Sequence, residues 1–308
     1  MLKQLVDHFI AVPLVGIDVG SAALKVVELA RTGGQIILRR AVVAAVQGDD
    51  QADALKRIWS DAGWRSTHAA LGLAAPGVIV KPFEVPPMPR KELRSALQLE
   101  AEQAVLNGHS ISQMAIDWHV MSSPLKASIR GILAVVPAAT LNARLHMARA
   151  AGLRPTVVDV EGLALWNAYW ALIAVREAAP KTALLMNVGA RTTNLVIAKS
   201  PDKLLLIRDL QLGATALEAG RSSDWVTEVR DSIGYARSQA GLRALDAAYV
   251  TGGGSGPKLI PLMKAAVSSP VTFWNPLNQL PCGADVTVEK SIGPLLAIAI
   301  GLALRQPS

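Results

Sequence analysis

The chain has 308 residues, 51% of them hydrophobic and 18% charged, which excludes a disordered protein and leaves room for two domains. Lysine and arginine outnumber aspartate and glutamate by 31 to 24, and the net charge of +7 favours acidic partners such as phosphates, nucleic acid or anionic lipid headgroups. The single cysteine, Cys282, excludes an internal disulfide, and the sequence lacks the run of about 20 apolar residues that a membrane span needs.

The first half of the chain is expected to form a mixed sheet followed by an insert. Apolar and β-branched runs separated by glycine turns predict three antiparallel strands at the start, and the prolines at 86, 87 and 89 mark a boundary. The predicted elements are strands at 14–19, 23–30 and 35–45, a helix at 53–62, strands at 68–73 and 78–85, a helix at 90–105, and strands at 115–121 and 128–136.

The second half repeats the opening pattern of three antiparallel strands after an expected hinge at 178–180. Before the hinge the predicted elements are a helix at 138–150, a strand at 156–160 and a helix at 162–175. After it they are strands at 183–188, 194–199 and 204–209, a long helix at 215–240, a strand at 247–250, a helix from 257 onward and a closing helix at 292–304. The repetition indicates the duplication of a whole domain.

Each set of three strands opens with a strand that ends in a polar residue and a glycine. The two segments are Ile17-Asp18-Val19-Gly20-Ser21 and Met186-Asn187-Val188-Gly189-Ala190. A glycine without Cβ lets phosphate reach the backbone N–H groups, and Ser21 with Thr192 or Thr193 would add donors. Asp18 would hold Mg²⁺ through water. An ordinary hairpin has the same signature, because aspartate and glycine are common turn residues.

A third element is the glycine run at 252–254, which follows a predicted strand and precedes a predicted helix. Adjacent glycines let the backbone approach a purine or a phosphate, and a helix N-terminus favours anionic oxygen. A flexible connection between strand and helix is the alternative interpretation.

These segments together resemble the superfamily of actin, hexokinase and the heat-shock chaperone ATPases, and within it the family of type IV pilus assembly proteins PilM. The resembling segments are VGIDVGS at 15–21, LKVVEL at 24–29, EAEQ at 100–103, VDVE at 158–161 and GLALR at 301–305. The resemblance implies an α/β fold of two lobes, each a mixed β-sheet flanked by helices. The expected first lobe is 1–176, with an inserted subdomain at about 87–136, and the second is 177–308, with its C-terminal helix returning to the first.

The same resemblance implies a cytoplasmic ATP-binding adaptor of the type IV pilus inner-membrane platform. Such an adaptor binds the short cytoplasmic N-terminal peptide of PilN, a single-span protein, and so lies at the cytoplasmic face of the inner membrane. The residues carried over are Asp18, Gly20 and Ser21 for the first phosphate loop, Gly189 and Thr192 for the second, Gly252, Gly253 and Gly254 for the adenosine loop, and Asp18 for Mg²⁺. We expect Lys25 to serve a surface or salt-bridging role.

Position 187 departs from the family pattern, which has aspartate there. The amide of Asn187 carries no charge for Mg²⁺ and cannot act as a base, so we expect nucleotide to bind and hydrolysis to be very slow or absent. If hydrolysis occurs, Glu161 is the candidate for orienting the water, although an acidic residue at a helix start has a simpler explanation in the helix dipole.

Glu100 and Glu102 are the candidate acceptors for a basic partner segment, with solvated helix charge as the alternative. Leu93 and Leu97 of the same predicted helix are expected in the core. Two other functions remain open: a small-molecule kinase on the same fold, with Asp159 or Glu161 as base, and a nucleotide-free adaptor of a competence or type II secretion system. Without a basic stripe interleaved with aromatic residues, nucleic-acid binding is not expected.

Overall fold

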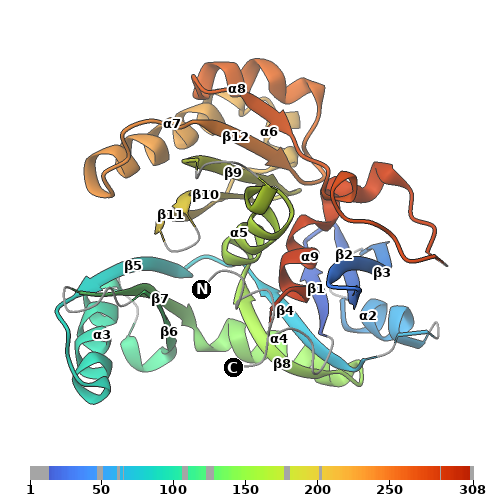
Figure 1. Ribbon diagram of the computed structural model, residues 1–308, viewed down its shortest axis with the longest axis horizontal. Coiled ribbons are helices and arrows are strands. Elements are labelled where there is room, and N and C mark those ends of the chain that lie inside the picture. Colours follow the sequence, from blue (N-terminus) through green and yellow to red (C-terminus); the bar gives the residue numbers. More distant parts are fainter. Residues whose placement is uncertain are drawn as a thin grey trace.

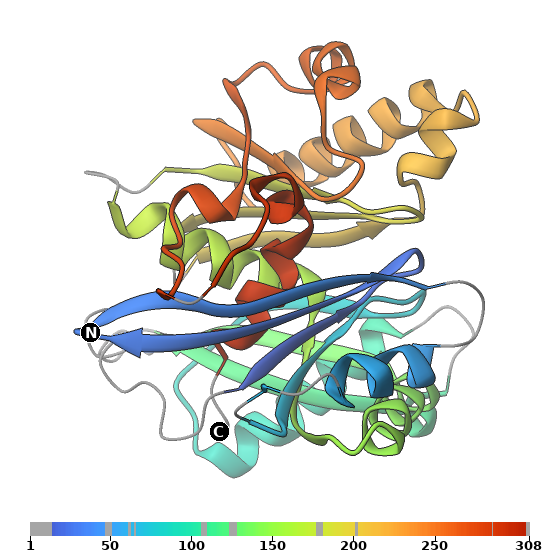
Figure 2. The same ribbon diagram turned by 90° about the vertical axis from the view of Figure 1, so that its right-hand side faces the viewer.

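The computed structural model describes residues 14–46, 51–60, 63–64, 66–105, 110–122, 128–176, 181–200, 203–284 and 286–305. Two five-stranded sheets lie one above the other, with helices α5 (Glu161–Leu172) and α9 (Ala297–Ala303) between them (Figures 1 and 2). The two-lobed α/β fold expected from the sequence is confirmed. The expected hinge at 178–180 lies outside the described residues.

The first sheet has the strand order β3-β2-β1-β4-β8. Its strands are β1 (Val15–Val19), β2 (Ala23–Thr32), β3 (Gln35–Ala45), β4 (His68–Leu73) and β8 (Arg154–Val160). The first three pair antiparallel and the last two join β1 in parallel. Helices α2 (Gln51–Ser60) and α4 (Ala138–Ala150) cover one face, and α5 and α9 cover the other.

The second sheet repeats this connectivity in the order β11-β10-β9-β12-β13. Its strands are β9 (Ala183–Val188), β10 (Thr193–Ser200), β11 (Lys203–Leu210), β12 (Ala247–Thr251) and β13 (Val271–Phe273). Helices α7 (Ser222–Gln239) and α8 (Ile260–Ala266) pack on its outer face, while α5 and α9 belong to the core that both sheets share. The polar ends of β1 and β9 thereby approach one another from opposite lobes.

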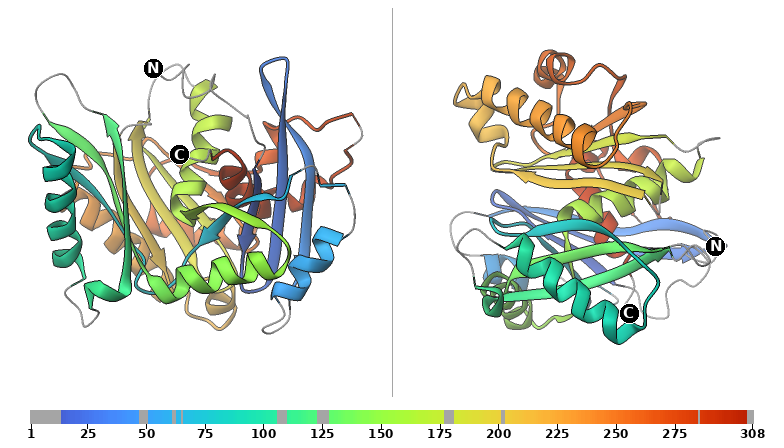
Figure 3. Two further views of the ribbon diagram at one scale, coloured as in Figure 1. Left: turned by 90° about the horizontal axis from the view of Figure 1, so that it is seen from below. Right: turned by 90° about the vertical axis from the view of Figure 1, so that its left-hand side faces the viewer.

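A separate three-stranded sheet has the order β5-β7-β6. It comprises β5 (Ile79–Val85), β6 (Met114–Ser122) and β7 (Ile129–Pro137), covered by α3 (Arg90–Ala104) on the side facing away from the rest of the molecule (Figure 3). Leu93 and Leu97 of α3 are buried against this sheet, so their predicted core role is confirmed. Strand β5, which precedes the proline cluster, is part of the same sheet.

Three sequence predictions are wrong in their details. The long helix at 215–240 is two helices, α6 (Ala214–Glu218) and α7, because Gly220 between them adopts φ +83°. The closing helix is a 3₁₀ segment at Lys290–Leu296 followed by the α-helix α9, since Pro294 lies within it. The segment between the helix predicted from 257 onward and the closing helix contains the short strand β13, paired with β12, where no strand is predicted. Further 3₁₀ turns lie at Ile111–Gln113, Ala174–Arg176, Pro257–Leu259 and Pro276–Asn278.

Candidate functional site

The two predicted glycine turns adopt the same local conformation. In the β1–β2 turn the N–H of Gly20 donates to the carbonyl of Ala23 at 3.1 Å, and in the β9–β10 turn the N–H of Gly189 donates to the carbonyl of Thr192 at 2.9 Å. A Cβ at Gly189 would lie 3.0 Å from the oxygen of Thr192, so this turn is closed tightly around the glycine. Equivalent turns therefore end the first strand of each lobe, as the sequence repeat indicates.

An ion pair lies at the first turn. Asp18 and Lys25 are opposite each other in the β1–β2 ladder, and Lys25 Nζ lies 3.1 Å from Asp18 Oδ2. Both side chains are largely removed from solvent, at 15% exposure for Lys25 and 6% for Asp18. The salt-bridging role expected for Lys25 is confirmed. The ammonium group of Lys25 also packs against the turn, since a Cβ built at Gly20 would lie 2.5 Å from Lys25 Nζ.

A row of polar side chains crosses the second sheet beside its turn. The strand register places Asn187 opposite Asn194, Asn194 opposite Asp209, and Thr251 beside Asn187. Asn187 Nδ2 donates to Asn194 Oδ1 at 2.9 Å, and Asn194 Nδ2 donates to Asp209 Oδ1 at 2.8 Å. Of these four residues only Asn187 is a predicted site residue. Each of the others ends or begins an apolar strand, but the pairing of the strands is needed to see the row.

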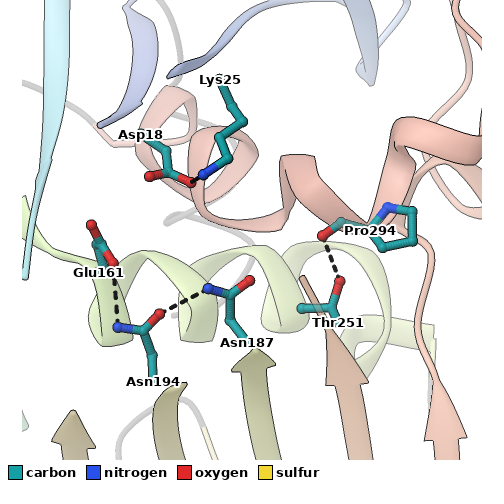
Figure 4. A network of polar contacts seen from close by, with 7 residues as sticks. All are labelled: Asp18, Lys25, Glu161, Asn187, Asn194, Thr251 and Pro294. Carbon is teal, nitrogen blue, oxygen red and sulfur yellow. Dashed lines mark hydrogen bonds and ion pairs between the residues drawn. The ribbon is translucent and has the colours of Figure 1, made fainter. Parts of the chain in front are cut away.

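Glu161 is bonded to this row and faces the first turn. Asn194 Nδ2 donates to Glu161 Oε2 at 3.3 Å, and Figure 4 shows Glu161, Asn194 and Asn187 on one side with Asp18 and Lys25 facing them. We call these five residues the interlobe cluster. It brings together groups from β1, β2, α5, β9 and β10, so side chains of both lobes meet at one place.

The interlobe cluster changes the protonation of Glu161. Burial, together with the nearby charges of Asp18 and Asp209, raises the pKa of Glu161 to about 8 against the opposing effect of Lys25 and Arg144. At neutral pH the carboxyl is therefore largely protonated. A protonated carboxyl can donate a hydrogen bond but is a poor base. Glu161 is therefore better suited to positioning a group by a hydrogen bond than to accepting a proton from it.

The hydroxyl of Thr193 makes its hydrogen bonds within the second lobe. It donates to the carbonyl of Leu212 at 2.7 Å and accepts from Trp225 Nε1 at 3.1 Å. Of the two threonines considered for the second phosphate loop, Thr192 is half-buried beside the turn. Ser21, the predicted donor of the first loop, is exposed at the tip of its turn.

The glycine run at 252–254 is explained in part by packing. Gly252 has φ +97°, and a Cβ there would lie 2.5 Å from the carbonyl oxygen of Val188. A Cβ at Gly254 would lie 2.8 Å from Val188 Cγ1. By contrast, the nearest described atom to a Cβ at Gly253 would be Leu295 Cδ2, at an ordinary 3.4 Å. Gly253 is thus the position at which a ligand, rather than the fold, would require glycine.

A divalent metal would have few protein ligands here. No group of three histidine, cysteine, aspartate or glutamate side chains within the described residues could hold a metal ion. Asp18 supplies one carboxylate in the interlobe cluster, while Asn187 supplies an amide whose Nδ2 is already a donor to Asn194. This fits Mg²⁺ that arrives with nucleotide phosphates and keeps several waters, and it does not fit a resident metal.

The remaining acidic candidates already have internal partners. Glu100 Oε2 lies 2.7 Å from Lys81 Nζ, and Glu102 Oε1 accepts from Gln98 Nε2 at 3.4 Å within α3. Asp159, a candidate base for a kinase, is buried, and its Oδ2 lies 3.1 Å from Arg305 Nε. Burial raises the pKa of Asp159 while Arg305 opposes that effect. The geometry therefore supplies no free carboxylate at Asp159.

The chain is similar to known proteins in both sequence family and fold. The profile of a family described as "Type IV pilus assembly protein PilM" matches residues 16–220. A chain from a structure titled "PilM-PilN type IV pilus biogenesis complex" shares 24% identity, with a TM-score of 0.79 and coverage of 95% of this chain and 98% of that one.

Two further structures match the chain more weakly. A Bacteroides thetaiotaomicron protein titled as having an actin-like ATPase fold is 10% identical, with a TM-score of 0.48 over 84% of this chain and 90% of its own. The cytoplasmic domain of EpsL, an inner-membrane component of the Vibrio cholerae type II secretion system, is 16% identical, with a TM-score of 0.48 over 94% of each chain. None of the helices in the described part of the present chain is long and apolar enough to cross a membrane.

Proposed function

Because this chain belongs to the type IV pilus assembly protein PilM family, we propose that it is an actin-like adaptor of the type IV pilus inner-membrane platform that binds ATP with Mg²⁺ between its lobes. It acts in the cytoplasm and reaches the inner membrane through a PilN-like protein, whose short N-terminal peptide it binds. Nucleic acid is not a partner.

The observation that carries the nucleotide proposal is the interlobe cluster. Glycine turns from both lobes lie beside one network in which Asp18, Glu161 and Asn187 are held by internal partners. Two duplicated turns on either side of one cluster suit a triphosphate, whose oxygens would accept from backbone N–H groups of both turns. The exposed Ser21 and the half-buried Thr192 would add hydroxyl donors, and Gly253 would approach the adenosine.

Bound nucleotide would act by shifting the equilibrium between conformations in which the two lobes are farther apart and conformations in which they are closer together. A ligand shifts such a balance only if it binds one conformation more tightly. ATP would contact Gly20 and Ser21 of one lobe and Gly189 of the other, so contacts to both lobes form together only when the lobes are close. Asp18 would hold Mg²⁺, whose charge would offset that of the phosphates.

Hydrolysis is proposed to be very slow or absent. Asn187 donates its amide hydrogen to Asn194, a bond that an aspartate could not make, and Glu161 has its pKa raised to about 8. The interlobe cluster therefore contains neither a second carboxylate for Mg²⁺ at position 187 nor a carboxylate at position 161 that is ionised at neutral pH. These features suit an adaptor whose conformation responds to bound nucleotide better than they suit an enzyme that hydrolyses ATP rapidly.

Calorimetric titration with Mg-ATP tests the nucleotide proposal. We expect saturable binding by the unmodified chain, weakened by Asp18→Asn and unaffected by Asp53→Asn, a matched change on the exposed face of α2. The absence of binding heat from the unmodified chain, confirmed by an unchanged melting temperature, would favour a nucleotide-free adaptor. Rapid steady-state phosphate release that disappears in Asp18→Asn would contradict the proposal of slow hydrolysis.

A separate titration tests the partner. A synthetic peptide of the cytoplasmic N-terminus of the PilN-like protein from the same organism should bind, as read by fluorescence anisotropy. The double change Glu100→Gln/Glu102→Gln should weaken a basic peptide if these residues receive it. Equal affinity would remove both residues from the binding surface. Their contacts with Lys81 and Gln98 within the protein would then account for them.

A further inference from the structure

Helix α4 directs one of its arginines toward the interlobe cluster. The helix packs on β4 and β8 of the first sheet, as Figure 1 shows, and its N-terminal end lies toward the carboxyl ends of those strands. Arg144 stands one turn before Ala148, which is fully buried in the first-lobe core, so both residues lie on the inner face of α4. Side chains on a helix lean toward its N-terminus, which carries Arg144 toward the edge where Asp18 and Glu161 lie.

The guanidinium of Arg144 is held near acidic groups without pairing with any of them. No hydrogen bond or ion pair within 4.0 Å joins Arg144 to another residue in the described ranges. At longer range its charge interacts with Glu161 and Asp18, while burial lowers the pKa of Arg144. Arginine stays charged despite such a shift, so the side chain is a partly desolvated cation with its donors still available.

The polar row indicates which part of a nucleotide this cation would meet. The glycine run at 252–254 follows Thr251 at one end of the row, and Asp209 lies at the other end, with Asn187 and Asn194 between them. If adenosine lies at the glycine run and its phosphates extend along the row, the terminal phosphate lies toward Asn194 and Glu161, which Figure 4 shows next to Asn187.

We propose that Arg144 binds the terminal phosphate of ATP and thereby distinguishes ATP from ADP. The inference rests on the proposed nucleotide function and adds a residue that neither glycine turn contains. A planar guanidinium can donate two parallel hydrogen bonds to a phosphate, which a lysine cannot reproduce. Lys25, already paired with Asp18, is a second cation near Glu161, Arg191 is a further one in the β9–β10 turn, and Asp209 is a further acidic group near Glu161.

A simpler role is that Arg144 offsets the negative charge of Asp18. The two roles differ in what they predict. A general counter-charge would support ATP and ADP binding about equally and would mainly affect stability. A terminal-phosphate ligand would affect ATP far more than ADP, because ADP lacks the group that it contacts.

The test measures Mg-ATP and Mg-ADP affinities of the full chain by calorimetry. Arg144→Gln should weaken ATP binding about 10–100-fold and change ADP binding less than about threefold, since one or two charge-assisted hydrogen bonds are lost with ATP alone. Arg144→Lys should lie between Arg144→Gln and the unmodified chain. Arg149→Gln, an exposed position on the same helix, should leave both affinities unchanged.

An equal loss for both nucleotides, or no loss, in Arg144→Gln would overturn the inference while leaving the proposed function in place. If the unmodified chain binds neither nucleotide, the proposed function and this inference both fail. Thermal unfolding shows whether each variant is folded. If Arg144→Gln is not, the ratio of ATP to ADP affinity is read from Arg144→Lys, and an unchanged ratio there overturns the inference.

Discussion

Replacing Glu161 by glutamine should change how stability depends on pH. Glutamine keeps an oxygen that can accept from Asn194 Nδ2, now at 3.3 Å, but it cannot ionise. Folding raises the pKa of Glu161 from an ordinary value of 4.5 to about 8. Between these two values the folded protein holds a proton that the unfolded chain has released.

The sign and size of the effect follow from that proton. Because the folded state binds more protons than the unfolded state, the free energy of unfolding falls as pH rises from 4.5 toward 8. One proton corresponds to about 1.4 kcal/mol for each pH unit. Burial also raises the pKa values of Asp159 and Asp209, so the unmodified chain has further contributions of the same sign. Those groups remain in Glu161→Gln, and the difference between the two chains isolates Glu161.

Urea unfolding at several pH values between about 5.5 and 7.5 is the assay. The unfolding free energy of the unmodified chain should fall more steeply than that of Glu161→Gln, by about 1.4 kcal/mol per unit, so that the variant becomes relatively more stable as pH rises. Glu218→Gln, at an exposed position in α6, should follow the unmodified chain. Parallel curves for Glu161→Gln and the unmodified chain would refute the raised pKa and the burial that causes it.

Four further substitutions test packing and the site. Gly301→Ala should lower the unfolding free energy by about 3 kcal/mol or more in denaturant titration, because its Cβ would overlap the carbonyl of Ala164 where α9 crosses α5. Gly234→Ala, at an exposed position of α7 with open space around the new Cβ, should raise it by about 0.5–1 kcal/mol. Gly253→Ala should leave the melting temperature unchanged and weaken Mg-ATP binding in calorimetry, and unchanged affinity would argue against contact between the glycine run and nucleotide. Asn187→Asp should cost about 1–3 kcal/mol of stability by facing an acceptor with an acceptor, yet raise Mg²⁺-dependent phosphate release; turnover as low as that of the unmodified chain would show that Asn187 is not what limits hydrolysis.

Much of the fold was accessible from the sequence because its signals are local. Alternating apolar runs and glycine turns predict β1 to β3 and β9 to β11, and their repetition indicates two lobes. The predictions failed where a single backbone residue overrides a helical pattern. Gly220 ends the first of two helices where one helix at 215–240 is expected. Pro294 lies in the first part of the expected closing helix, which is a 3₁₀ segment instead.

The two lobes and the glycine turns at Gly20 and Gly189 could be predicted from the sequence, because each depends on residues that are close together in the chain, and the asparagine at position 187 is visible there directly. Which charged groups lie together follows from the folding of the chain in space. The pairing of Asp18 with Lys25, the row from Thr251 to Asp209 and the position of Arg144 arise from strand register and helix packing between distant segments. The raised pKa of Glu161 arises in the same way, since burial and charge act through space rather than along the chain.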